Sequence, residues 1–438
     1  MLAADLSPIP ESARTQSGLD LFLIFAAANV VATTLQTGAV LGTRYGTSQM
    51  MALVAVGALV GAALVALLAP VGSRSGVPSM IAARAPLGRG GAGLVAAILY
   101  LTNFAWIAVN NTIAASVCAQ LLGGPATARL WAAGLGIAAT AVVSQGPRAV
   151  GRADRVAVPL MAVAGSVLTW TAFTQAPAAP LAARPDAPSW LWGMDVIVGY
   201  QVSWLLMFAD YSRYTKSPRA SSTAVFAGLV LPALWLMPIG WSLARLAGSE
   251  DPGTMFAAAG VGVWTALLVA LATVTTNFVN IYLSSLAWRS LVPRAPSAAS
   301  VWAIGLIGTA LGLVSSGWLD RFADLMLALG SVLVPVGGVF IAHFVIARRA
   351  VNVASVYDVA TLPAVRMAGI LAWAAGIVVY RLAAPIGATL PALATSVLVY
   401  LLLSRGSGAR DQGSAIRDQG SGVRDRGFRG QRTENGRR

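Results

Sequence analysis

The sequence has little charge. Only 11% of its 438 residues are Asp, Glu, Lys or Arg, whereas 57% are hydrophobic and the mean hydropathy is +0.72. Soluble proteins carry about 25% charged and about 45–50% apolar residues. Most of the surface therefore cannot face water, which excludes a soluble enzyme, a nucleic-acid-binding protein and a secreted disulfide scaffold. Apolar runs of membrane-spanning length recur, so we predict an all-α polytopic membrane protein.

Cysteine and histidine each occur once. Cys118 and His343 both lie within apolar runs. One cysteine cannot form an internal disulfide, and one Cys with one His provides neither a Cys/His metal site nor a Cys–His nucleophile pair. We therefore expect no enzymatic activity and no cofactor other than a coupling ion.

Twelve apolar segments are predicted as transmembrane helices. Residues 1–17 lack the basic region and cleavage site of a signal peptide, so we expect them to form a retained cytoplasmic segment before a membrane domain at 18–403. The helices are predicted near residues 18–42, 48–70, 91–122, 128–146, 155–174, 190–211, 222–247, 257–288, 298–318, 322–347, 365–383 and 385–403.

The net charge of +14 is distributed unevenly between the predicted connecting segments. Outside the tail, 15 Lys and Arg residues fall on the side that holds both termini and six fall on the other side. This asymmetry predicts two cytoplasmic termini in the cell membrane. Residues 404–438 are rich in Gly, Ser and Arg and are predicted to be a disordered basic tail. The expected partners are the lipid bilayer and a small substrate, with no nucleic acid, for a monomer or weak oligomer.

The predicted helices form two sets of five, at residues 18–174 and 190–347, followed by two extra helices at 365–403. An odd number of spans inverts the second set relative to the first. Inverted repeats are typical of secondary transporters, whose substrate and ion sites lie at mid-membrane beside unwound helices. The first helix of each set carries polar side chains inside the span: Asn29, Thr33, Thr34, Gln36, Thr37, Tyr200, Gln201 and Ser203. Interhelical hydrogen bonding is the alternative explanation for such residues.

A second polar cluster lies in the predicted helix 257–288. Thr275, Thr276, Asn277 and Asn280 place four polar side chains within six residues. Threonine hydroxyls and backbone carbonyls are oxygen ligands without formal charge, as a hard cation such as sodium requires. Alternatively, the hydroxyls bond only to their own helix backbone.

The predicted helix 91–122 combines an aromatic ring with amides. Asn103, Trp106 and Asn110 are spaced i, i+3 and i+7, so they share one helical face. A ring to stack on and amides to pair with suit a flat, hydrogen-bonding heterocycle. Packing between helices would use the same residues.

Acidic residues are rare within the predicted spans. Asp210 lies at a helix end, three residues before Arg213, which predicts a cap or a gate salt bridge rather than a proton relay. No span carries an acid at mid-bilayer, which favours sodium over proton coupling.

Together these motifs resemble the nucleobase–cation symporter-1 family, most closely its bacterial cytosine permease branch. The resemblance covers nearly the whole chain before the tail. It is carried by GLDLFLIFAAANVVATTLQTGAVLG, SGVPSMIAARAPLGRGGAGLVAAILYLTNFAWIAV, GYQVSWLLMFADYSRYTKSP, TTNFVNIYLSS and LGSVLVPVGGVFIAHFVIARR. It implies a LeuT-type fold of a 5+5 inverted repeat plus two C-terminal helices, and inward transport of flat heterocycles with sodium.

The resemblance also implies two sets of site residues. The stacking tryptophan corresponds to Trp106, its neighbouring amide to Asn103, the helix 6 serine to Ser203, and the helix 6 aromatic to Gln201, which is a departure. The expected substrate site comprises Val31, Asn103, Trp106, Asn110, Gln201, Ser203, Asn277 and Asn280. The expected sodium ligands are the carbonyls of Ala27, Val30 and Ala272 and the hydroxyls of Thr275 and Thr276.

The sequence thus predicts a sodium-coupled importer of a nucleobase or related flat heterocycle that works by alternating access. An amide at Gln201 would favour a substrate with more edge donors than cytosine. The alternative is a proton-coupled symporter of a heterocycle such as hydroxymethylpyrimidine, allantoin or hydantoin. A sensor would need a folded output domain and a channel would more often be a symmetric oligomer of few spans, so both rank lower.

Overall fold

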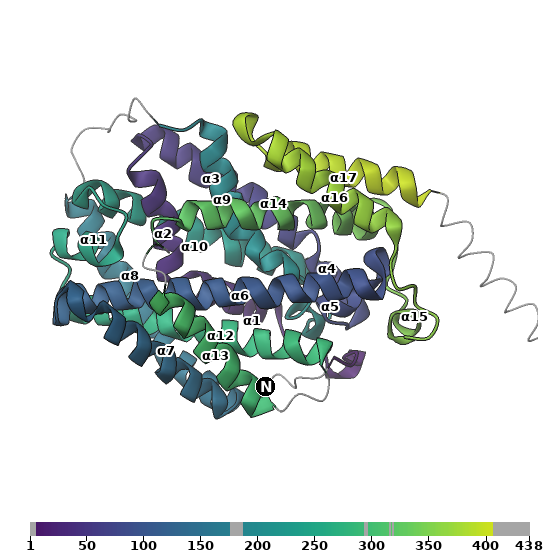
Figure 1. The fold of residues 1–438 in the computed structure, drawn as a ribbon, viewed down its shortest axis with the longest axis horizontal. Helices are drawn as coiled ribbons and strands as arrows, with labels where there is room; N and C mark the ends of the chain where they lie inside the picture. Colours follow the sequence, from purple (N-terminus) through teal and green to yellow (C-terminus); the bar gives the residue numbers. More distant parts are fainter. Residues whose placement is uncertain (1–5, 176–186, 293–296, 315–316, 318, 406–438) are drawn as a thin grey trace, which may run out of the picture.

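The computed structural model describes residues 6–175, 187–292, 297–314, 317 and 319–405, and these are almost entirely helical (Figure 1). The predicted tail at 404–438 lies almost wholly outside the described residues. The helices up to residue 175 are α1 (Gly18–Asn29), α2 (Ala32–Gly42), α3 (Thr47–Ala66), α4 (Ala69–Ser75), α5 (Ser79–Ala82), α6 (Arg84–Leu122), α7 (Ala128–Ser144) and α8 (Pro147–Gln175).

The second half of the described helices begins at Trp190. They are α9 (Trp190–Gln201), α10 (Pro218–Ala247), α11 (Pro252–Ala258), α12 (Val263–Leu291), α13 (Ser297–Val314), α14 (Phe322–Phe340), α15 (Val353–Tyr357), α16 (Met367–Leu382) and α17 (Thr389–Ser404). Two 3₁₀ turns, Val202–Met207 and Ser212–Tyr214, follow α9, and a π-helical turn, Ile341–Ile346, follows α14.

Several helices have membrane-spanning length and composition. Six described helices meet both criteria, and the bent pair α1–α2 makes seven. Parts of α13, α16 and α17 are apolar but shorter. The predicted total of twelve spans, and the repeat boundaries at 18–174 and 190–347, therefore stay predictions.

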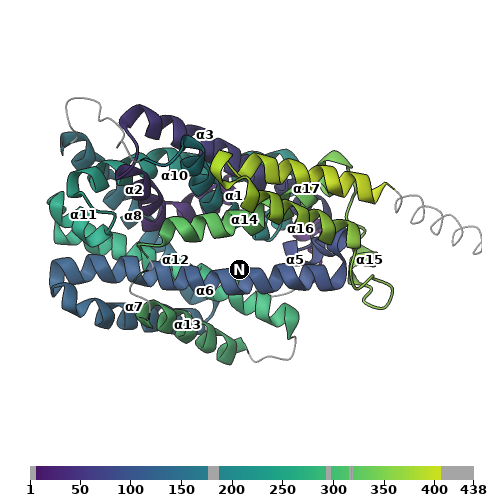
Figure 2. The same cartoon turned by 45° about the horizontal axis from the view of Figure 1, so that its top comes forward.

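The helices pack in two groups. In the first, which we call the α10 group, α1, α2 and α3 pack on α10, and α9 packs on α3. In the second, the α12 group, α6, α8 and α7 pack on α12, and α13 packs on α6 and α7. Figures 1 and 2 show α7 and α13 side by side, and α16 beside α17 at the periphery, where both pack on α14. The candidate site lies where the two groups meet.

The short helices α11 and α15 lie at opposite ends of the molecule (Figure 1). The N-terminal segment is bound at the α15 end, where the Tyr357 hydroxyl donates to the Leu6 carbonyl. There Arg14 donates to the Ser73 carbonyl (2.7 Å), and the Gln16 amide donates to the Tyr214 carbonyl (3.0 Å). This segment therefore joins the loop after α9 to α4 and α15.

Two glycines let α2 and α10 approach closely. A Cβ atom built on Gly38 would lie 1.9 Å from the Met237 carbonyl oxygen, and one on Gly240 would lie 1.9 Å from the Leu35 carbonyl oxygen. Backbone cannot yield as a flexible side chain can. Glycine at both positions is thus a condition for the central helix contact of the α10 group.

We expect Gly240→Ala to destabilise the protein by about 1–3 kcal/mol, because the added methyl overpacks the α2–α10 contact. The measurement is thermal unfolding of the detergent-purified protein. Gly134→Ala is the matched control, since a Cβ at Gly134 in α7 meets nothing within 4 Å and should be neutral or slightly stabilising. Equal melting temperatures for the two variants would contradict the close contact.

Candidate substrate and ion site

The first transmembrane segment is broken in its middle. Helices α1 and α2 meet at a bend of 53° across Val30 and Val31, both of which leave the helical conformation. The backbone hydrogen bonds of α1 end where the Val30 amide donates to the Ala26 carbonyl (2.8 Å). Helical hydrogen bonding begins again in α2, where the Thr34 amide donates to the Val31 carbonyl (3.1 Å). The break confirms the predicted unwinding of this segment.

Polar side chains replace part of the lost backbone pairing at this break. The Thr34 hydroxyl donates to the Asn29 carbonyl (2.5 Å) and lies 2.6 Å from the Tyr200 hydroxyl. The Asn29 side chain donates to the Phe25 carbonyl (2.8 Å) and accepts from the Trp204 indole N–H (3.2 Å). These contacts tie the break to the segment around α9.

The predicted segment 190–211 is interrupted as well. Helix α9 ends at Gln201 and continues as the 3₁₀ turn Val202–Met207. The Ser203 hydroxyl donates to the Tyr200 carbonyl (2.7 Å) at the start of that turn. The first segment of each predicted repeat is therefore discontinuous, as expected for a site of this kind.

Helix α12 contacts the first break at Ala272. Val31, which is 3% exposed, packs with Ala272 and Val30 in a small apolar cluster. The hydroxyls of Thr275 and Thr276 donate to the Ala272 carbonyl, at 2.8 and 3.2 Å. Both hydroxyls therefore bond to the backbone of their own helix, as the alternative explanation holds, and Val30 and Val31 contact Ala272 through apolar side chains. Ala27 lies three residues before Val30 in the last turn of α1, and the five sodium ligands stay a prediction.

These residues fit a sodium ion chemically. The break releases carbonyls from helical pairing, and a threonine hydroxyl that donates its proton keeps its lone pairs as cation ligands. All the ligands are neutral oxygens, the donor type preferred by hard cations. Among the described residues, no three His, Cys, Asp or Glu side chains gather as a metal site.

Aromatic rings surround Trp106 on α6. The ring of Tyr200 lies 6.0 Å from that of Trp106, and the ring of Phe322 lies 6.4 Å from it, both edge-on. On the other side of the first break, the rings of Trp204 and Phe25 are 5.2 Å apart. Sequence reasoning missed Tyr200 and Trp204 as ring-bearing site residues, although both flank the polar stretch at Gln201 and Ser203.

Gln201 is predicted to face the substrate opposite Trp106, but the structure places its side chain against other helices. The Gln201 side chain is fully buried, donates to the Leu229 carbonyl of α10 (3.2 Å) and lies against Gly61 of α3. Tyr200 is the α9 residue whose ring meets Trp106. Successive helical residues point about 100° apart. Tyr200 therefore lies on the side of Trp106, while its neighbour Gln201 lies on the side of α3 and α10.

The predicted amides meet at the contact between α6 and α12. Asn110 donates to Asn277 (3.1 Å), and Asn280 donates to the same oxygen (3.4 Å). Within the described residues, the Nδ2 of Asn103 and the Oδ1 of Asn110 are buried without a hydrogen-bond partner. Both belong to the Trp106 face of α6, which leaves one donor and one acceptor available there.

The predicted gate salt bridge is absent from the described residues. Arg213 donates to the Ser7 carbonyl (3.4 Å) and the Tyr214 hydroxyl (3.1 Å), and its guanidinium lies 5.0 Å from the Tyr214 ring centroid. No ion pair joins it to Asp210 in the ranges that the structure describes. The guanidinium of Arg213 thus contacts the N-terminal segment and Tyr214.

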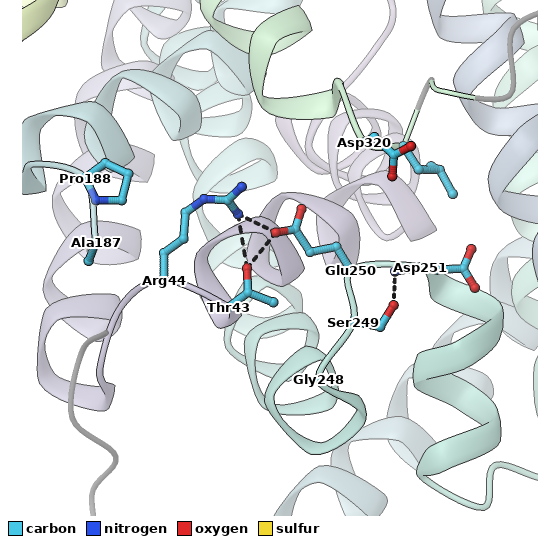
Figure 3. A pocket seen from close by; sticks show the side chains of 10 residues that line it. Thr43, Arg44, Ala187, Pro188, Gly248, Ser249, Glu250, Asp251 and Asp320 are labelled. Atoms are coloured by element: carbon cyan, nitrogen blue, oxygen red, sulfur yellow. Dashed lines mark hydrogen bonds and ion pairs between the residues drawn. The ribbon is translucent and has the colours of Figure 1, made fainter. Parts of the chain in front are cut away.

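An ion pair does occur at the α11 end. Arg44, just after α2, pairs with Glu250, which follows α10, in a polar cavity of about 610 Å³ (Figure 3). The guanidinium also lies 5.4 Å from the Trp192 ring of α9. The remaining lining is Thr43, Ala187, Pro188, Gly248, Ser249, Asp251, Leu319 and Asp320. Arg44 therefore joins α2, α9 and the loop after α10 at this end.

This geometry is matched by comparison with known proteins. Residues 8–402 match the family of permeases for cytosine/purines, uracil, thiamine and allantoin. The chain belongs to this family. Its members are membrane transporters, so this permease is a transporter and not an enzyme, as predicted.

Individual relatives agree with this assignment. The permease is 25% identical to the cytosine permease of Escherichia coli (strain K12) over 348 residues, which cover 78% of this chain and 81% of that protein. The structure matches the inward-facing conformation of Mhp1 with a TM-score of 0.79 and 17% identity, over 94% of this chain and 95% of that one.

Two further structures share the fold. Mhp1, a nucleobase-cation-symport-1 family transporter, in a closed conformation with bromovinylhydantoin bound, matches with a TM-score of 0.76 at 18% identity, over 92% of this chain and 94% of that one. A Na⁺-coupled sialic acid symporter matches with a TM-score of 0.60 at 12% identity, over 90% and 89%. The predicted family and the LeuT-type fold class are confirmed.

We expect Gln201→Met to leave the binding of cytosine, uracil or allantoin within about twofold of the original, because this side chain faces α3 and α10. It should lower stability by about 1 kcal/mol through loss of the hydrogen bond to Leu229. Trp106→Ala should weaken binding at least about tenfold, since it removes an aromatic face. Calorimetry and thermal unfolding measure both effects; equal loss of binding in the two variants would contradict the orientation of Gln201.

Proposed function

We propose that this permease imports a nucleobase or related flat heterocycle together with sodium, across the cell membrane, by alternating access. The observation that carries the proposal is the meeting of two discontinuous helices, α1–α2 and α9, beside Trp106 and the threonine pair of α12. Family membership supports a heterocycle as cargo. Both termini are assigned to the cytoplasm, so the α15 end faces inward and the α11 end outward.

The substrate would stack on Trp106 near mid-membrane. Asn103 and Asn110 flank Trp106 on its face of α6 and retain an unused donor and an unused acceptor. Tyr200, Trp204 and Ser203 would approach from the discontinuous α9 segment, and Val31 and Asn280 would complete the wall. This set combines apolar area with a few polar groups, as small-molecule sites do.

Sodium would bind where the first break meets α12. Its ligands would be the carbonyls of Ala27, Val30 and Ala272 and the hydroxyls of Thr275 and Thr276. The ion would join the α10 group to the α12 group, next to the substrate. Each ligand would then favour the arrangement that the other requires, and this reciprocity is the coupling.

Transport would require the two helix groups to move relative to each other. At the α11 end, the Arg44–Glu250 pair joins elements of the α10 group and lines the outer cavity. At the α15 end, the N-terminal segment spans α4, the loop after α9 and α15. Because these contacts lie at opposite ends, they can be made or released in different phases of the cycle.

The first test is ligand-induced thermal stabilisation of the purified permease. Cytosine, uracil, hypoxanthine, allantoin, thiamine and hydantoin are added in sodium chloride or in choline chloride. At least one compound should raise the melting temperature, and more strongly in sodium, because binding to the native state stabilises it. Equal stabilisation in both salts would contradict sodium coupling and favour the proton-coupled alternative. No stabilisation by any compound would contradict the proposed substrate class.

We expect Thr276→Ala to raise the sodium concentration for half-maximal heterocycle uptake at least about fivefold, because it removes one proposed sodium ligand. Thr273→Ala is the matched control. The Thr273 hydroxyl also donates to its own helix, to the Val269 carbonyl (2.8 Å), but it lies outside the proposed ion site. Unchanged sodium dependence in Thr276→Ala, or an equal shift in both variants, would contradict the ligand assignment.

A further inference from the structure

A chain of buried side chains runs from Trp106's face of α6 into the centre of the α12 group. Asn110 donates to Asn277 Oδ1 (3.1 Å), and Asn277 donates to Asn111 Oδ1 (2.8 Å). Asn111 in turn donates to the Thr309 hydroxyl (3.3 Å) on α13. We call Asn110, Asn277, Asn111 and Thr309 the amide relay; each is at most 4% exposed.

Backbone carbonyls fix the direction of the amide relay. The Thr309 hydroxyl donates its single proton to the Gly305 carbonyl (2.7 Å), so it can only accept from Asn111. The Asn111 amide must therefore point its nitrogen at Thr309 and its oxygen at Asn277. The Asn111 oxygen can only accept, so Asn277 must point its nitrogen at Asn111. The Ile107 carbonyl also accepts from Asn277 Nδ2 (3.4 Å), which requires this same orientation of Asn277.

The direction of the relay determines what Asn110 presents. The nitrogen of Asn277 points at Ile107 and Asn111 of α6. Its oxygen therefore turns toward Asn110 and Asn280, which both donate to it. Asn110 must then use its nitrogen for Asn277. Its oxygen remains buried without a partner in the described residues. This argument settles the orientation of an amide whose two ends look alike in shape.

Close packing holds the far end of the relay. A Cβ atom on Gly136 of α7 would lie 2.2 Å from the Thr309 hydroxyl and 2.6 Å from Asn111 Nδ2.

Both polar atoms of Asn277 are already engaged, so this residue is not available to a substrate. The sequence predicts Asn277 as a substrate-site residue, whereas in the structure its polar atoms bond to α6 and to Asn280.

We propose that Asn277, Asn111 and Thr309 are positioning residues that fix Asn110 as a hydrogen-bond acceptor, and thereby select heterocycles that present an N–H group to α6. The inference rests on the proposed function and deepens it by specifying the substrate edge. Asn103, seven residues earlier on the same face, keeps an unused nitrogen. The selected ligand is a flat ring stacked on Trp106 with a donor toward Asn110 and an acceptor toward Asn103.

Rigid orientation is what creates the selectivity. A free asparagine could rotate by 180° and accept either a donor or an acceptor from the ligand. With Asn110 held, a ring that presents an acceptor leaves two acceptors facing each other in a buried site. Sites of this kind reject the mismatched analogue strongly.

The test uses two pairs of bases with inverted edges. Uracil and cytosine differ in which ring and exocyclic positions donate or accept, and so do hypoxanthine and adenine. Dissociation constants are measured in sodium for the original protein and for Asn277→Ala, Thr309→Val and Thr309→Ser. Thr309→Val keeps the shape but removes the hydroxyl, whereas Thr309→Ser keeps the hydroxyl. Neither position contacts the proposed substrate.

For the original protein, the dissociation constants of the two bases in at least one pair should differ by about tenfold or more. Asn277→Ala and Thr309→Val should narrow that ratio to less than about threefold, and Thr309→Ser should preserve it. If Thr309→Val and Asn277→Ala both keep the original ratio of dissociation constants, the relay is overturned. It is also overturned if both variants weaken the binding of the two bases equally, since that result indicates a structural role alone. No separation of either pair by the original protein would also overturn it. If no base binds the original protein, the proposed function fails and the inference falls with it.

Discussion

The central constraint on this structure is that backbone N–H and C=O groups need partners inside an apolar environment. Two segments of the transporter interrupt their helices there, after Asn29 and after Gln201. The released groups at the first break are partly satisfied by Thr34, whose hydroxyl contacts both the Asn29 carbonyl and Tyr200. Asn29 and Trp204 add a second connection. The polar atoms that remain are the candidate ligands for the proposed binding site in an otherwise apolar bundle.

The contacts of the candidate site divide according to the helix groups. Hydrogen bonds around the first break stay within the α10 group, and the amide relay stays within the α12 group. Across the boundary, Val31 meets Ala272 and Tyr200 meets Trp106 through apolar or edge-on ring contact. Such contacts have little directionality, so the boundary can rearrange at lower cost than either group. Ligands placed at this boundary are therefore well situated to control a change between two arrangements.

The close approach of α2 and α10 makes one of these groups rigid. Gly38 and Gly240 let backbone lie against backbone, which positions α2 relative to the helix that also holds α1 and α3. Arg44, at the end of α2, then reaches Glu250 at the end of α10. The polar cavity beside Arg44 is therefore bounded by residues that follow α2 and α10, the two helices whose backbones are in close contact.

The membrane class, the discontinuity of the first segment and the shared face of Asn103, Trp106 and Asn110 on α6 could all be predicted from the sequence. Hydropathy and helical period are local properties, so these predictions needed no tertiary information. Ala272 of α12 contacts Val30 and Val31, which places the helix of the threonine pair beside the first break. The family resemblance supplied that pairing, because no local rule joins residues more than two hundred positions apart.

Tertiary structure alone decided the rest. Gln201 and Tyr200 are neighbours in sequence, and only the packing of α9 against α3, α10 and α6 assigned the ring to the Trp106 side and the amide to the other. Spacing alone suggested a pair of Arg213 with Asp210, whereas in the structure Arg213 donates to the Ser7 carbonyl of the N-terminal segment. The role of Asn110 depends on the carbonyls of Gly305 and Ile107, through side chains on three helices. Hydrogen-bond direction is set by such chains of contact, which composition and spacing do not encode.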